Sequence, residues 1–304
     1  MSRITATLAA TLGAAALMAG AAEAQNRRLN PATPADAVTI GRKVACSTRD
    51  GEAVVYHWSG KAYSRVQGER DRHLFNVEGM NVRHCGTVRD PQRGVGYRMT
   101  SRELMLYLDP KTNEVLRTWS NPWTSESVEV LHVANDPVNM RPTYPVTERG
   151  EPYRFEGRVD NGRVFMPIEV PLFYKNPLAG EYQDFVGNQY HAMEIFNFIG
   201  DEADLFDASR TSANPSIAWT RIAEWLPWMR MGDRPGIMII NATGHKVSRG
   251  IEGLPAVLRQ EIAANYPDYR TPPPLNDTRP NETSWTYFKK WIDSKKPAAP
   301  APAR

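Results

Sequence analysis

The sequence predicts a mainly β protein, an antiparallel barrel or sandwich, of which a lipocalin-like cup is one form, with helices added near the C-terminus. Three observations support this fold class. Apolar residues alternate in twos from Val38 to about Val170 of the 304-residue chain. Turn-forming residues recur about every ten residues, as they do between the strands of antiparallel barrels and sandwiches. Helical spacing of apolar residues appears only in the last third.

The N-terminus has the pattern of a secretory signal peptide. Arg3 precedes an apolar run, Ile4 to Ala22, which ends in the cleavage-site sequence Ala22-Glu23-Ala24. We therefore expect residues 1–24 to be removed and the protein to be exported, either periplasmic or secreted; a buried helix or a membrane anchor is the alternative. No later stretch reaches the roughly 20 apolar residues that span a bilayer, so no transmembrane segment is expected in the mature chain.

The remaining chain is expected to form one domain. We predict a flexible leader over 25–37, a single β-rich domain with late helices over 38–294, and a disordered Pro/Ala tail over 295–304. An apolar fraction of 41% and eight Trp can supply a sizeable core. The net charge of +3 is spread over mixed charges without a basic stripe, so nucleic-acid binding is not expected.

The strand pattern begins near Val38 and continues to about Val170. The segment "EAVVYHWSGKAYSRV" places Val54, Tyr56 and Trp58 on one face and predicts a turn or bulge at Ser59-Gly60. Later, "QYHAMEIFNFI" and "GIMIINAT" also read as strands. Hairpin turns are predicted at 109–113, at 121–124 and around Asn161-Gly162.

Three segments of the last third predict helices. The segment "PSIAWTRIAEWLPWM" has Trp219, Ile222, Ala223 and Leu226 at helical spacing. The segment "LPAVLRQEIAANYP" has a similar apolar side, and "TSWTYFKKWIDSKK" opens with a Thr/Ser cap. We expect these helices to cover an open end or edge of the sheet.

The chain has two cysteines, Cys46 and Cys85. In an oxidising compartment an even pair most simply forms a disulfide, with two buried free thiols as the alternative. Closing a loop of this length would stabilise the fold by roughly 4 kcal/mol in the chain-entropy model.

Several segments resemble one bacterial family. The stretches "FNVEGMNVRHC", "SRELMLYLDPKTNEVLRTWSNPWTSESVEVLHVANDPVN", "WLPWMRMG" and "TSWTYFKKW" are similar to the family known as domain of unknown function 1838. The resemblance runs from about Gly41 to Trp291. It implies a single exported or secreted domain, leaves the chemistry open and assigns no catalytic residue.

Familiar catalytic signatures are absent from the sequence. It has no Gly-rich phosphate loop, no H-E-x-x-H, no Cys-x-x-Cys and no G-x-S-x-G elbow, so no cofactor is expected. His84, His132, His191 and His245 do not stand at metal-ligand spacing, and no metal site is predicted.

The segment "LHVANDPVN" concentrates polar groups. We take His132 and Asp136 as candidate catalytic residues and Asn135 and Asn139 as candidate ligand-binding residues, because the density exceeds what turn capping needs. The alternative is that Asn135, Asp136 and Asn139 only cap local backbone groups before and after Pro137.

Further candidates come from charged residues within apolar strands. Glu194 shares a predicted strand face with Tyr190 and Phe196, and a carboxylate buried there would have a raised pKa suited to acid–base catalysis. Of the adjacent Arg102 and Glu103, one must point towards apolar surroundings. The candidate set is Glu194 as a third catalytic residue, with Arg102, Tyr190 and Trp119 as ligand-binding residues.

Three function classes follow. The first is an exported, cofactor-independent hydrolase, lyase or isomerase that acts on a small apolar or aromatic molecule in a β-barrel cavity. The second is a non-catalytic binding protein for a hydrophobic small molecule. The third is a structural or interaction protein, which would have a large apolar surface patch and no cavity.

Overall fold

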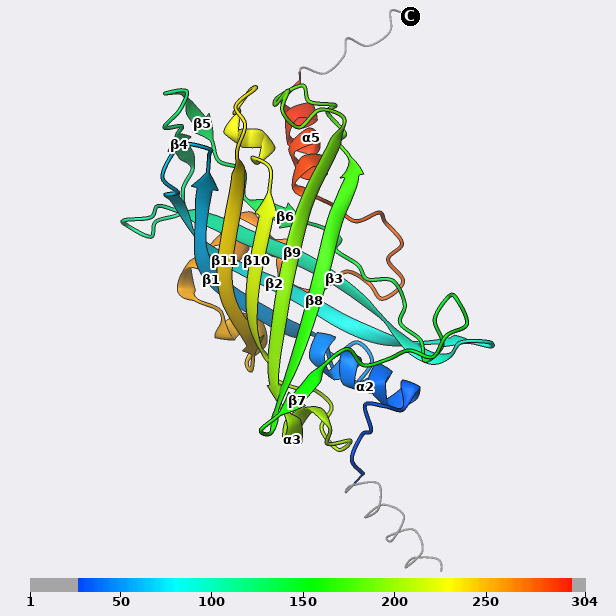
Figure 1. Cartoon of the computed structure of the whole chain (residues 1–304). Coiled ribbons are helices and arrows are strands. Elements are labelled where there is room, and N and C mark those ends of the chain that lie inside the picture. The colour runs from blue at the N-terminus through cyan, green and yellow to red at the C-terminus, as the bar shows by residue number, and fades with distance from the viewer. Residues whose placement is uncertain (1–26, 297–304) are drawn as a thin grey trace, which may run out of the picture.

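The computed structural model describes residues 27–296, which form one nine-stranded antiparallel sheet with added helices (Figure 1). The strand order is β6-β3-β2-β1-β11-β10-β9-β8-β7, so the fold is mainly β and antiparallel, as predicted. The predicted signal peptide and all but the first two residues of the predicted tail lie outside the described residues. The nine strands are β1 (Val54–Arg65), β2 (Arg72–Asp90), β3 (Gly94–Leu108), β6 (Val133–Asn135), β7 (Arg158–Asp160), β8 (Arg163–Lys175), β9 (Gln189–Asp201), β10 (Ser216–Ala223) and β11 (Ile237–Val247).

The sheet is open and bends back over itself. Its edges are β6 and β7, which do not pair with each other. Strands β2 and β3, of 19 and 15 residues, cross behind the upright strands β8 to β11 (Figure 1). The result is a two-layered cup, and the inner surface of this bent sheet is called the concave face below.

Helices lie at both ends of the cup. Helix α2 (Pro34–Ala45) lies at the lower end in Figure 1, and α5 (Ser284–Lys295) lies at the upper end. Helix α5 begins with a capping box between Thr283 and Thr286, so the predicted Thr/Ser cap is confirmed. The remaining elements are short: α3 (Glu202–Leu205), α4 (Ala256–Asn265), the 3₁₀ turns η1 (Pro227–Met229), η2 (Gly250–Gly253) and η3 (Pro267–Arg270), and the hairpin β4 (Thr118–Ser120) with β5 (Ser127–Glu129).

Both faces of the back layer are buried. On the concave face, β2 and β3 contribute Phe75 and Tyr107 to an aromatic core with Trp119 and Trp228. On the opposite face, residues of β2 and β3 pack against α4 and the segments around it; these are Met80, Val82, Leu104 and Leu106, with Leu254, Leu258 and Ile262. Period-two alternation therefore does not distinguish an inner from an outer face in these two strands.

The predicted hairpin turns are confirmed. Asn113 N donates to Asp109 O, and Ser125 N donates to Asn121 O, closing the first two turns. Asn161 and Gly162 join β7 to β8 with φ of 48° and 75°, both in the left-handed region that a two-residue hairpin requires.

The turn or bulge predicted at Ser59-Gly60 is wrong, because β1 runs unbroken through it. Gly60 instead allows close approach of the neighbouring strand, since a Cβ there would lie 2.1 Å from Asn241 O. The irregularity in this region falls between Ala62 and Tyr63, where the pairing of β1 with β2 shifts register.

Two further expectations are corrected. The segment predicted as a helix around Trp219 is strand β10, whose alternate residues Ile217, Trp219 and Arg221 share the concave face. Its apolar residues are compatible with both helical spacing and strand alternation. The segment forms a strand because its backbone pairs with β9 on one side and β11 on the other. The leader predicted over 25–37 is shorter than expected, because Leu29 is buried and α2 begins at Pro34 in a segment expected to be loop and strand.

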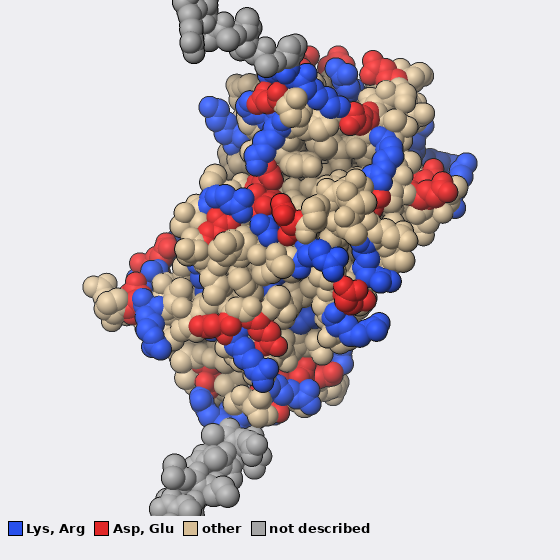
Figure 2. All heavy atoms as spheres, turned by 180° about the vertical axis from the view of Figure 1, so that it is seen from behind, with Lys and Arg blue, Asp and Glu red and all other residues tan. Residues whose placement is uncertain are grey.

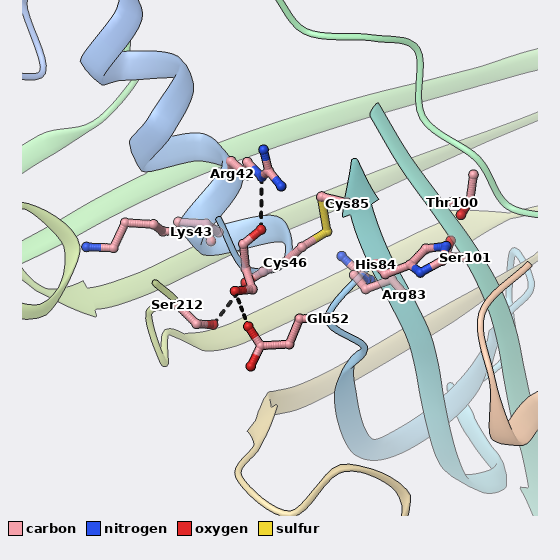
Figure 3. The surroundings of a disulfide bond; sticks show 12 residues. Arg42, Lys43, Cys46, Glu52, Arg83, His84, Cys85, Thr100, Ser101 and Ser212 are labelled. Carbon is pink, nitrogen blue, oxygen red and sulfur yellow. Dashed lines mark hydrogen bonds between the residues drawn. A yellow bond between two sulfur atoms is a disulfide. The ribbon is translucent and has the colours of Figure 1, made fainter. Parts of the chain in front are cut away.

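A disulfide joins α2 to the sheet. Cys46, which follows α2, is bonded to Cys85 of β2 with a Cα–Cα distance of 5.8 Å, as predicted (Figure 3). Lys246 Nζ donates to the carbonyl oxygens of Lys43 and Cys46, each at 2.9 Å. The end of α2 is thus held covalently by β2 and by hydrogen bonds from β11.

Strand β8 has a long open side. Strand β7 pairs only with residues 163–165, so within the described residues the following part of β8 pairs on one side alone. Pro167 and Pro171 lie in this part, and Phe173 is 73% exposed.

Candidate functional site

A cavity of about 90 Å³ lies on the concave face of the bent sheet. Residues from β1, β2, β3, β9 and β10 line it: Tyr56, Trp58, Asn81, Arg83, Glu103, Glu194, Phe196, Phe198, Ile217 and Trp219. Five of these ten residues are aromatic, one is aliphatic and four are polar. This is the composition typical of a ligand site, in which apolar walls surround a few placed polar groups.

Strand register brings the polar residues of the back layer together. Asn81 is the direct partner of both Tyr56 on β1 and Glu103 on β3, so the three side chains form a row across the concave face. Arg83 lies two residues further along β2, diagonal to Glu103. Diagonal Cβ atoms in an antiparallel pair are about 7–8 Å apart or somewhat less, within reach of long side chains.

Glu103 has the chemistry of an acid–base group. Within residues 27–296 its carboxylate accepts no hydrogen bond and forms no ion pair. Burial, and secondarily the negative charge of Glu194, raise its pKa from 4.5 to about 7, against the opposing effect of Arg221 and Arg83. At neutral pH both protonation states are therefore populated, as a proton-transfer group requires.

The guanidinium of Arg83 lines the same cavity and is fixed by two contacts. Its Nε donates to Asn81 Oδ1 at 2.6 Å, and its guanidinium carbon lies 4.7 Å from the centre of the Tyr56 ring. Tyr56 is itself fixed, because its hydroxyl donates to Val44 O at 2.5 Å. Asn81 and Tyr56 thus orient the guanidinium from two sides.

Glu194 lines the cavity, as its predicted role requires, but its charge is already paired. It forms an ion pair with Arg221, its direct neighbour on β10. Tyr190 lies deeper and is fully buried; burial raises the pKa of Tyr190, while Arg221 beside it acts in the opposite direction. Glu194 therefore neutralises Arg221, and the uncharged Tyr190 lies beside Arg221 without lining the cavity, so its predicted ligand-binding role does not fit its position.

Arg102 faces away from the cavity. The pleat directs Glu103 to the concave face and Arg102 to the opposite one. There Arg102 Nε lies 3.0 Å from Asp136 Oδ2, and its Nη1 donates to the carbonyl oxygens of Asp268 and Thr271. It attaches the chain around η3 to β3, so a ligand-binding role does not fit its position.

His132 is a buried core residue outside the cavity. Its side chain is 3% exposed, its ring stacks on that of Tyr107, and its Nδ1 accepts the Tyr107 N–H at 3.1 Å. Burial, and secondarily the charge of Arg117, lower its pKa from 6.5 to about 4. A neutral histidine that satisfies a strand N–H is structural, and its predicted catalytic role does not fit this position.

The other polar residues of "HVANDPVN" connect segments of the chain. Asp136 precedes a cis peptide bond to Pro137 and pairs with Arg279 at 2.7 Å as well as with Arg102. Asn139 Oδ1 accepts the N–H of Ser101, while Asn135 is a buried residue of β6. Neither Asp136 nor these two asparagines line the cavity. The capping alternative does not describe the loop either, because the side chains of Asp136 and Asn139 bind residues far along the chain and not local backbone groups.

Trp119 is also a core residue. It is 9% exposed and packs against Phe75 and Trp228. Of the ten residues that line the cavity, only Glu194 was among the predicted site residues. The prediction missed the other nine: Tyr56, Trp58, Asn81, Arg83, Glu103, Phe196, Phe198, Ile217 and Trp219. For Asn81 and Arg83 the usable signal was their alternation with Val77 and Gly79 in "VEGMNVR".

The comparisons with known proteins identify the family and nothing more specific. A family model described as "Protein of unknown function (DUF1838)" matches residues 51–292, which is most of the chain. The chain belongs to this family. No curated protein and no solved structure matches it.

Among residues 27–296 no group of three or more His, Cys, Asp or Glu side chains is placed to hold a metal ion. In the same part of the chain, the helices all fall short of the length and apolarity that a membrane span needs.

Proposed function

We propose that this DUF1838 protein is an exported, cofactor-independent enzyme that performs acid–base chemistry on a small, largely apolar or aromatic molecule. The observation that carries the proposal is Glu103, an unpaired carboxylate in an aromatic cavity with a pKa raised to about 7. The Cys46–Cys85 disulfide supports export, because such bonds persist in oxidising compartments.

The proposed mechanism is proton transfer at a carbon atom next to a carbonyl group. Ionised Glu103 accepts the proton, and the guanidinium of Arg83 stabilises the negative charge that develops on the carbonyl oxygen. Return of the proton from Glu103 to another carbon gives isomerisation, and departure of a group from the neighbouring carbon gives elimination. These two reactions fit better than hydrolysis, because they need no separate nucleophile.

The distribution of surface charge supports a small-molecule ligand and not a nucleic acid. On the face shown in Figure 2, Lys and Arg are interspersed with Asp and Glu and form no basic stripe.

One observation favours the alternative, a binding protein without catalysis. Glu194 is already paired with Arg221, which leaves Glu103 as the unpaired carboxylate of the cavity. In that case Glu103 and Arg83 would orient a ligand and transfer no proton.

Deuterium exchange distinguishes the two functions. Purified mature protein is incubated in D₂O with a panel of small aryl ketones and unsaturated aromatic carbonyl compounds, together with any molecule that native mass spectrometry finds co-purifying. We expect deuterium to enter the carbon next to the carbonyl group, with kcat/KM rising as the pH increases through about 7. Glu103→Gln should reduce the rate by roughly 100-fold or more.

Glu169→Gln, which changes an exposed carboxylate on β8, is the matched control and should leave the rate unchanged. Exchange that persists in Glu103→Gln would contradict the assignment of Glu103. Ligand binding without exchange, for every compound of the panel, would favour the binding protein.

A further inference from the structure

The guanidinium of Arg83 lacks a partner for its outer nitrogens. Apart from the Nε bond to Asn81, it donates to no side chain or carbonyl oxygen within residues 27–296. None of the carboxylates in the described part of the chain lies at ion-pair distance from it, although Glu103 is close enough to act on it electrostatically. The two outer nitrogens therefore border the cavity with free donors.

A second arginine on the concave face, Arg221, has a counter-charge. It is paired with Glu194 and lies beside Tyr190. Arg83 is partly buried, and a partly desolvated guanidinium without a counter-charge is disfavoured. Because Arg221 has a counter-charge and Arg83 has none among the described residues, an external anion is expected at Arg83.

We propose that the ligand carries a carboxylate group, which binds the outer nitrogens of Arg83 and is itself the carbonyl group next to which the proton is transferred, while its apolar part lies against Trp58, Phe196 and Trp219. The inference deepens the proposed function, on which it rests, by naming the substrate class: a small aromatic or unsaturated carboxylic acid. A carboxylate matches the planar fork of a guanidinium with two parallel hydrogen bonds.

The size of the cavity excludes drug-sized ligands, and its charge disfavours phosphate. The cavity of about 90 Å³ is well below the roughly 300–1,000 Å³ of sites for drug-sized ligands, so it accommodates about one ring with a short substituent. A phosphate carries more negative charge than a carboxylate, and Glu103 diagonal to Arg83 would repel it more strongly.

A bound carboxylate would also act on Glu103. Its negative charge adds to that of Glu194 and favours the protonated form of Glu103. Ligand binding should therefore be accompanied by proton uptake, and the affinity should fall as the pH rises above about 7.

The test compares matched pairs of probes by isothermal titration calorimetry on the mature protein. The probes are benzoate, phenylacetate and cinnamate, each with its uncharged amide, and inorganic phosphate. We expect at least one carboxylate to bind about ten-fold or more tightly than its amide at pH 6.5, and phosphate not to compete with it. Arg83→Gln should abolish the preference for the carboxylate, whereas Arg230→Gln, an exposed arginine, should keep it.

Two results would overturn the inference: no carboxylate binding better than its amide, or an unchanged preference in Arg83→Gln. The pH dependence separates this inference from the proposed catalysis. In Glu103→Gln the carboxylate should still bind, and its affinity should no longer fall above pH 7. A carboxylate that binds through Arg83 to a protein without exchange activity would refute the enzyme and uphold the ligand class.

Discussion

Glu103 and Arg102 are neighbours of opposite charge, and the pleat of β3 sends one to the cavity and the other to the chain around η3. Glu103 is a destabilising residue above neutral pH, because its ionised form is partly buried and has no ion-pair partner within residues 27–296. Folding raises the pKa of Glu103 from 4.5 to about 7. Below about pH 4.5 the carboxyl group is protonated in both the folded and the unfolded state and costs no stability, and the folded state loses stability as the pH rises through about 7.

Glu103→Gln should therefore stabilise the protein. We expect the variant to exceed the wild type in free energy of unfolding by about 1–3 kcal/mol at pH 8, and this difference to disappear near pH 4.5. Urea unfolding at the two pH values measures it. Equal stability at pH 8 would mean that the carboxylate is well solvated in the folded state.

His132 should behave in the opposite way. His132→Ala removes a buried ring and leaves the Tyr107 N–H without its acceptor, so we expect a loss of about 3 kcal/mol at pH 7.5. Because folding lowers the pKa of His132 from 6.5 to about 4, the neutral ring stabilises the fold fully above pH 6.5 and progressively less down to pH 4.

The difference between wild type and His132→Ala should accordingly shrink as the pH falls through that range. Thermal unfolding at a series of pH values tests this. A variant as stable as the wild type at pH 7.5 would show that the ring is not part of the core.

Among the elements, the strands with plain alternation and the turns with Asn, Asp, Pro or Gly were predictable. Arg102 and Glu103 show a limit of this prediction. Both faces of β3 are apolar, so the periodicity predicts that one of the two charged side chains faces apolar surroundings but does not predict which one faces the cavity. Strand β10 shows a second limit, because Trp219, Ile222 and Ala223 satisfy helical spacing while two neighbouring strands supply the hydrogen bonds that decide.

Helix α2 depends on its covalent link to β2. Replacing Cys46 and Cys85 together with Ser removes a constraint on a sequence separation of 39 residues, which corresponds to about 4 kcal/mol of unfolding free energy. Urea unfolding of the variant measures the loss, and wild type unfolded in the presence of a reductant should give the same value. A reduced wild type that keeps its full stability would contradict the role given to the bridge.

At the scale of the whole molecule, the bend of the sheet creates the site. Glu103 on β3 and Glu194 on β9 belong to opposite layers, and only the folded sheet lets one charge raise the pKa of the other. The fold class was predictable from local patterns, whereas this meeting of distant strands leaves no local signal. Glu194 could be identified from its own strand, because it shares a face with Tyr190 and Phe196. Its partner Arg221 and the Arg83–Asn81 pair were missed, because their proximity to the cavity depends on distant strands.

The coupling between the layers is measurable. Glu194→Gln removes a negative charge and leaves Arg221 without its partner, so both changes should lower the pKa of Glu103 from about 7. Carboxyl ¹³C NMR titration of labelled protein measures it, with Glu169→Gln as a control that leaves it unchanged. An unchanged pKa in Glu194→Gln would show that the two layers are electrostatically independent.

The open side of β8 bears on association of the protein by strand addition. Backbone N–H groups of successive strand residues point to alternate sides, so Pro167 and Pro171 remove donors from the same side of β8. Because β8 pairs with β9 without a break from Arg163 to Lys175, this is the open side. An incoming strand would find two missing donors beside an exposed Phe173, and growth of fibre-like assemblies by strand addition is disfavoured. Replacing both prolines with Val should therefore produce oligomers on size-exclusion chromatography during storage, whereas Pro122→Val in a hairpin turn should not.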